Sequence, residues 1–239
     1  MKKFQLGVLT TIVLLLSVSA FSQKSERRWE DIGLRDVVGN DTIKKGKFTL
    51  VFINKSAKFS TATKDRMVQT FFKVYPKEAK LYNKKTRNIV TIVIEPAYAG
   101  VAAASNGIIK VNPEWMIKNP EDIDVVTHEV MHIVQAYPGV AGPGWVTEGI
   151  ADYVRYKLGV NNAAANWSLP AYNSKQSYKD AYRVTARFLV WVEKNYNKHL
   201  VKKLDTAMRT KTYTDGIWKK LTRKTVDELW DVYKNNPVI

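Results

Sequence analysis

The sequence predicts an α+β domain in which the strands come first and the helices follow. Two short runs rich in β-branched and aromatic residues, 48–53 and 89–94, lie in the N-terminal half, and such runs are typical of strands. After about residue 113, apolar residues recur mainly at helical spacing. Neither an internal repeat nor a linker divides residues 47–239. We therefore expect one domain, with an N-terminal sheet followed by a mainly helical C-terminal half.

Residues 1–22 have the features of a secretory signal peptide. Lysines precede an apolar run over 6–18, and small residues end the segment, so that cleavage is expected near Ser22. The apolar run is shorter than the roughly 20 residues that a transmembrane helix needs. The sequence therefore predicts a secreted or periplasmic protein without a stable transmembrane anchor. Residues 23–46 are polar and contain three glycines, which predicts an irregular N-terminal arm.

The first half of the expected domain alternates strands with one helix. The run 48–53 is a strand, and apolar residues over 64–82 have helical spacing, which we expect Pro76 to interrupt. The run 89–94 is the clearest strand of the chain. Residues 102–111 predict a hairpin or edge strand, with Asn106-Gly107 as its turn.

The second half is expected to be helical. A first helix over 122–137 ends at Pro138-Gly139, and a loop rich in glycine and proline separates it from a second helix over 145–158. The pattern predicts further helices over 178–196, 199–209, 214–219 and 225–234. Thr225 and Glu228 form a capping box, which marks the start of the last helix.

The composition restricts the partners and the chemistry. The formal net charge is +16, from 38 lysines and arginines against 22 acidic residues. With a signal peptide, this charge indicates an anionic partner outside the cell, such as a cell-surface polymer, rather than nucleic acid. Alternatively, the basic residues, which are spread along the chain, only keep the protein soluble. The sequence contains no cysteine, so disulfides and a lipidated cysteine are excluded.

The segment His128-Glu129-Val130-Met131-His132 carries the strongest chemical signal. Residues four apart lie on one face of a helix, so that both imidazoles can reach the same ion. Zinc binds imidazole nitrogen, and a catalytic zinc site has three protein ligands and a position left for water. Glu129 is placed to accept a proton from that water. Only three histidines occur in the chain, and two of them lie in this motif.

Glu148 is the candidate third metal ligand. The loop before 145–158 lets the second helix turn back toward the first, and Glu148 and Asp152 share one face of it. One carboxylate can bind the metal while the other accepts the free N–H group of a ligand histidine. We assign Glu148 to the metal and Asp152 to the histidine. The reverse assignment, or a pairing of Asp152 with Arg155 or Tyr156, remains open.

The motifs resemble known metallopeptidases. HExxH followed by EGxADY is similar to the gluzincins, and the plant basic secretory protein family, which has bacterial members, is a closer match. The matching segments are THEVMHIVQ (127–135), EGIADYVR (148–155), AYRVTARFLVWV (181–192) and KTVDELWDVYK (224–234). The resemblance implies a zincin-like fold and a bound Zn²⁺. It also implies hydrolysis of peptide bonds by a zinc-activated water, with Glu129 as general base.

An enzyme of this kind also needs a group that stabilises the oxyanion. Tyr182, within one of the matching segments, is the first candidate, and Tyr172 and Tyr153 are alternatives. The small residues of the predicted strand at 102–105 would allow an extended substrate to pair with it; otherwise this segment is a plain hairpin.

Two other functions share these residues. The first alternative is a secreted basic protein on a zincin scaffold that binds cell-surface polymer or polysaccharide, as a defence protein does. The second alternative is a metal-dependent hydrolase that acts on substrates other than peptides. Hydrolysis measured on the wild type and on Glu129→Gln separates the binding protein from the enzymes.

Overall fold

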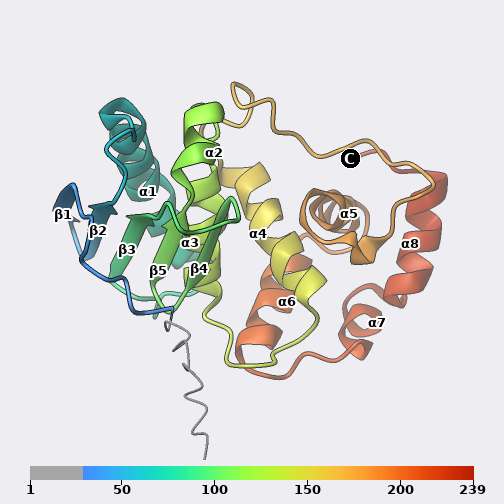
Figure 1. Ribbon diagram of the computed structural model, residues 1–239. Coiled ribbons are helices and arrows are strands. Elements are labelled where there is room, and N and C mark those ends of the chain that lie inside the picture. Colours follow the sequence, from blue (N-terminus) through green and yellow to red (C-terminus); the bar gives the residue numbers. More distant parts are fainter. Residues whose placement is uncertain (1–28) are drawn as a thin grey trace, which may run out of the picture. The chain divides into compact units, whose positions relative to one another are not determined.

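A five-stranded sheet occupies the N-terminal part of the computed structural model, which describes residues 29–239 (Figure 1). Residues 32–239 form one compact unit. The strands are β1 (Gly39–Lys45), β2 (Phe48–Asn54), β3 (Ile89–Ile94), β4 (Ala102–Ser105) and β5 (Ile108–Val111). Their spatial order is β1-β2-β3-β5-β4, with β2, β3 and β5 parallel and the two outer strands antiparallel. β4 is therefore an edge strand. The predicted signal peptide lies outside the described residues.

Both central strand predictions and the hairpin prediction are confirmed. β2 and β3 bury Leu50, Phe52 and Ile92 completely, which is expected of parallel strands covered on their faces. Asn106 and Gly107 form the turn between β4 and β5, and both have the positive φ angles, 50° and 85°, that a tight hairpin turn requires.

The prediction that residues 23–46 form an irregular arm is wrong for β1. This strand pairs with β2 along its whole length, but none of its seven residues is fully buried. Backbone hydrogen bonds to β2 hold this strand in place. Its sequence lacks the alternation of apolar and polar residues that predicts a half-buried strand. Gly46 makes the turn to β2 with a φ of 58°.

The expected interruption at Pro76 is also wrong. Helix α1 (Thr61–Leu81) continues through this residue. The proline has no N–H group to donate to the preceding turn. Val74, Tyr75 and Ala79 are buried around it, and this packing outweighs the loss of one hydrogen bond.

The rest of the chain is mainly helical, which confirms the α+β prediction. The helices are α2 (Pro113–Lys118), α3 (Val125–Gln135), α4 (Gly144–Leu158), α5 (Tyr182–Asn195), α6 (Leu200–Arg209), α7 (Gly216–Thr222) and α8 (Val226–Asn235). The sequence pattern missed α2. The helix expected over 178–196 is divided at Ala181 into the short 3₁₀ helix η1 (Tyr178–Asp180) and α5. The capping box of Thr225 and Glu228 begins α8 as predicted.

Helix α3 lies beside β4 and packs against both α1 and α4, and α4 in turn packs against α5 (Figure 1). Gly149 is the point of close approach between α4 and α5. A Cβ atom at this position would lie 2.2 Å from Cγ2 of Thr185, so that only glycine fits. Among the described residues, no helix is long and apolar enough to cross a membrane.

Candidate metal centre

Helix α3 presents two histidines side by side. Nε2 of His128 lies 3.1 Å from Nε2 of His132. The start of the helix is fixed by the buried carboxylate of Asp124, which accepts hydrogen bonds from the hydroxyl of Thr127 (2.7 Å) and the backbone N–H of Val160 (2.8 Å). The helix ends at Ala136, which has a left-handed conformation. Both imidazoles are therefore held on one anchored helix.

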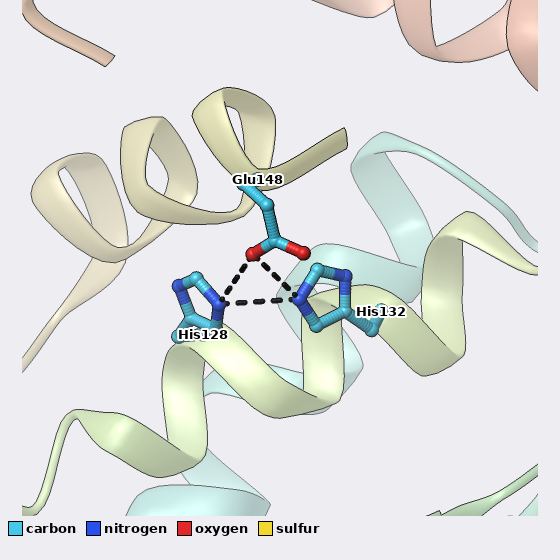
Figure 2. Close-up of side chains that lie close together, drawn as sticks. All are labelled: His128, His132 and Glu148. Atoms are coloured by element: carbon cyan, nitrogen blue, oxygen red, sulfur yellow. Dashed lines mark hydrogen bonds and ion pairs between the residues drawn. The ribbon is translucent and has the colours of Figure 1, made fainter. Parts of the chain in front are cut away.

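Glu148 reaches the same point from α4. Its Oε2 atom lies 3.3 Å from Nε2 of His128 and 3.4 Å from Nε2 of His132 (Figure 2). Figure 2 shows the carboxylate of one helix facing the two imidazoles of the other. The structure thus brings together the three residues that the sequence selected as metal ligands.

The three donor atoms fit a zinc ion. In a tetrahedral site with bonds of about 2.1 Å, neighbouring ligand atoms are about 3.4 Å apart. The observed separations are 3.1, 3.3 and 3.4 Å. Two imidazole nitrogens and one carboxylate oxygen are also the donor types that catalytic zinc sites use.

Asp152 accepts a hydrogen bond from the ring nitrogen of His128 that faces away from the other ligands. Its Oδ1 atom lies 2.7 Å from Nδ1 of His128, so a proton on Nδ1 leaves the lone pair of Nε2 free for a metal. The alternative pairing of Asp152 with Arg155 is not present, because Arg155 donates to Asp122 at 2.5 Å.

The charges around the imidazoles favour a cation. Burial lowers the pKa of His128, but hydrogen bonds to Asp152 and Glu148 outweigh burial and raise it to about 10. Burial raises the pKa of Glu148, and its hydrogen bonds to the two histidines more than offset this, so that its pKa falls below the usual range. The site therefore stabilises positive charge, carried by a proton or by a metal ion.

Gln135 orients the second histidine and is a residue that the sequence reasoning missed. Its Oε1 atom lies 2.7 Å from Nδ1 of His132, and its Nε2 atom donates to the backbone carbonyl of Thr147 at 2.9 Å. Thr147 directly precedes Glu148. One buried amide, only 1% exposed, thus links both helices of the site. The sequence signal was its position three residues after His132, on the same helix face.

Glu129 lies beside the ligands with one carboxylate oxygen unpaired. Its side chain is 5% exposed, and its Oε2 atom has no hydrogen bond. Burial raises its pKa, and the two histidines oppose that shift. An unpartnered carboxylate oxygen with a raised pKa is suited to accept a proton from a water molecule.

Tyr182 stands at the entrance of the site. Its ring lies 6.1 Å from the ring of His128 at an angle of 20°, and the residue is 54% exposed. The charge of Glu148, followed by burial, raises its pKa, so the hydroxyl stays protonated and can donate. Ala181 and Tyr182 both have positive φ angles, 63° and 47°, a strained conformation that aims the ring.

The two alternative tyrosines lie elsewhere. The hydroxyl of Tyr153 donates to Glu193, and the ring of Tyr172 packs against Trp230. A different tyrosine, Tyr98, does line the site, and the sequence reasoning missed it. Burial and the charge of Glu129 raise its pKa. It belongs to the loop between β3 and β4, so only the sheet order brings it here.

A cleft of about 1570 Å³ passes over the candidate metal ligands. The whole of β4 lines it, together with Tyr182 and residues 164–167. β4 is an edge strand beside the site, as the sequence reasoning expected, and the carbonyl of Ala102 accepts a hydrogen bond from the hydroxyl of Tyr98 at 3.2 Å.

The chain matches one known family over most of its length. The model of a family described as peptidases of plants and bacteria matches residues 31–233. No curated protein matches the chain. Among solved structures, a two-domain M1 zinc metallopeptidase variant bound to L-arginine is similar, with 14% identity and a TM-score of 0.44. An M1 zinc metallopeptidase variant from Deinococcus radiodurans, bound to a Tyr-Ser-Ala substrate, gives the same values. Each match covers 82% of this chain and 48% of the other, so this chain spans about half their length.

Proposed function

Because the chain belongs to the family of peptidases of plants and bacteria, we propose that it is a zinc metallopeptidase that hydrolyses peptide bonds. His128, His132 and Glu148 would hold the ion. When bound, zinc lowers the pKa of a water molecule and polarises a carbonyl group. The observation that carries the proposal is the convergence of three donor atoms at 3.1–3.4 Å beside an unpartnered carboxylate oxygen of Glu129.

The surrounding residues have separate tasks in this proposal. Glu129 accepts the proton of the attacking water and passes it to the leaving amine, since its raised pKa suits both steps. Tyr182 donates its hydroxyl proton in a hydrogen bond to the oxyanion. Asp152 and Gln135 hold the two imidazoles in the tautomer and orientation that binding requires.

The substrate backbone would lie along β4. The small side chains of Ala102, Ala103 and Ala104 allow close approach. Apart from the carbonyl of Ala102, which accepts from Tyr98, the outer edge of β4 would offer its backbone groups to an extended peptide. This arrangement would place a peptide carbonyl between the metal ligands and Tyr182.

The decisive experiment combines metal content with hydrolysis. We expect about one zinc per chain in the wild type and chelator-sensitive cleavage of a broad peptide mixture. Glu129→Gln should keep the metal and lose turnover, whereas His132→Ala should lose both. Full cleavage by Glu129→Gln would remove the general base from the mechanism. Zinc without any cleavage of peptides would instead favour a hydrolase with another substrate, or a binding protein.

Export and polymer binding complete the proposal. The pattern of residues 1–22 supports secretion, which N-terminal sequencing of protein from the culture medium or periplasm would test. The exposed Lys73, Lys77 and Lys80 recur at helical spacing on α1 and favour binding to an anionic cell-surface polymer. Such binding should weaken steeply with salt, and a salt-independent affinity would contradict it.

A further inference from the structure

Outside the candidate metal centre, the carboxylates of the cleft are paired with cations of the protein. Glu121 accepts two hydrogen bonds from Arg66, at 2.9 and 2.7 Å. Asp122 is paired with Arg155 and also accepts from the indole N–H of Trp115 at 2.8 Å. The remaining acidic residues of the lining are Glu129, Glu148 and Asp152, which form the candidate metal centre. Within residues 29–239, every carboxylate of the lining outside that centre is therefore paired already.

Three cationic side chains of the same cleft, in contrast, have no acidic partner among residues 29–239. Arg87, Lys118 and Arg183 line it and are exposed. No ion pair joins any of them to an acidic residue in the described part of the chain. Arg155, by contrast, is buried and neutralised by Asp122. Outside the candidate metal centre, the charge of the described cleft lining that has no ion-pair partner is thus positive.

Among these cations, Arg183 is the one that adjoins a residue of the candidate site along the chain. It follows Tyr182, whose ring stacks on His128. Its guanidinium makes one long hydrogen bond, 3.5 Å, to the carbonyl of Ser168, and most of its five donors remain available. Arg87, in contrast, lies beside Gly107 in the turn after β4, and Lys118 ends α2.

We infer that the cleft selects peptides with an acidic side chain close to the scissile bond, and that Arg183 is the main determinant of this preference. The inference rests on the proposed function, because it names the substrate class of that site. A guanidinium can form two parallel hydrogen bonds with a carboxylate. The net charge of +16 also attracts acidic peptides over a distance. A basic side chain in the same place meets repulsion and no counter-charge.

Binding tests the inference without turnover. Glu129→Gln serves as the non-hydrolysing protein, and the ligands are fluorescent peptides blocked at both ends. A single Glu is moved along the peptide, and each Glu peptide has a Gln counterpart. At the best position we expect about 3- to 10-fold tighter binding of the Glu peptide. This ratio should shrink at high ionic strength.

Two further variants locate the effect. Arg183→Gln, added to Glu129→Gln, should bring the Glu-to-Gln ratio close to one. Arg35→Gln removes the same charge from an exposed position that does not line the cleft, and it should leave the ratio as it was. Equal binding of the Glu and Gln peptides, no binding of either, or an unchanged ratio in the Arg183 variant would overturn the inference.

Hydrolysis by the wild type separates this inference from the proposed function. Cleavage of the same peptides with the same preference supports both. A preference in binding with no cleavage of any peptide upholds the acidic preference and rejects the peptidase. Equal cleavage and equal binding of the Glu and Gln peptides would uphold the peptidase and reject the acidic preference.

Discussion

Replacing Gln135 by Leu tests whether one amide couples the two helices of the metal centre. The side chain is 1% exposed, accepts from Nδ1 of His132 and donates to the carbonyl of Thr147. Leucine has a similar volume, so that the change removes hydrogen bonds without creating a large cavity. It leaves the Nδ1–H group of His132 and the carbonyl of Thr147 without partners. Both groups are only partly buried, so the cost is about 1–2 kcal/mol each, the lower part of the usual range.

Two measurements separate stability from metal binding. The metal-free variant should lose about 2–4 kcal/mol of unfolding free energy. Its zinc affinity, measured by competition with a chelating dye, should fall about 10- to 100-fold, as is usual when a partner of a ligand histidine is lost.

Gln135→Glu provides the matched control. The new carboxylate still accepts from His132, but it no longer donates to the carbonyl of Thr147. Zinc affinity should therefore recover more than stability does. If Gln135→Leu lost stability and bound zinc as tightly as the wild type, Gln135 would be a packing residue with no part in orienting His132.

Three further changes test other parts of the structure. Glu78 is fully buried with both oxygens unpartnered, and burial raises its pKa well above 4.5, with His128 opposing. The folded state thus keeps a proton that the unfolded state releases, so stability should fall as pH rises above about 4.5. Glu78→Gln should flatten this fall and raise the Tm at pH 7, and a lower Tm would contradict the burial argument. Gly149→Ala should cost at least about 1–3 kcal/mol in chemical denaturation, because its Cβ would overlap Thr185; an unchanged midpoint would refute the close approach. Glu148→Gln should lose most of the bound zinc in elemental analysis, and full occupancy would exclude it as a ligand.

The candidate metal centre was predictable because each pair of its residues follows the spacing of one helix. His128 and His132 are four apart, as are Glu148 and Asp152, and the intervening loop leaves few ways to arrange two helices. Gln135 and Tyr98 were not predictable in the same way. Glutamine and tyrosine occur in many environments, and Tyr98 reaches the site only because β5 separates β3 from β4 in the sheet.

The fold was predictable where burial gives a periodic pattern. β2 and β3 are apolar runs, whereas β1 depends on backbone pairing and leaves no trace in the pattern. Pro76 was overestimated as a helix breaker because tertiary packing of α1 is invisible in sequence. Ala181 divides the helix expected over 178–196 by adopting a φ of 63°, which no rule for alanine would suggest.

A metal ion bound by these three ligands would also have a mechanical role in the chain. Two ligands belong to α3 and one to α4, and the sequence has no cysteine. An ion held at this point would act as a cross-link that closes the segment between His132 and Glu148. A closed loop of about 16 residues removes conformational entropy from the unfolded chain worth roughly 3 kcal/mol. The ion would thus do the work of a disulfide, in a form that a chelator, rather than a reductant, can undo.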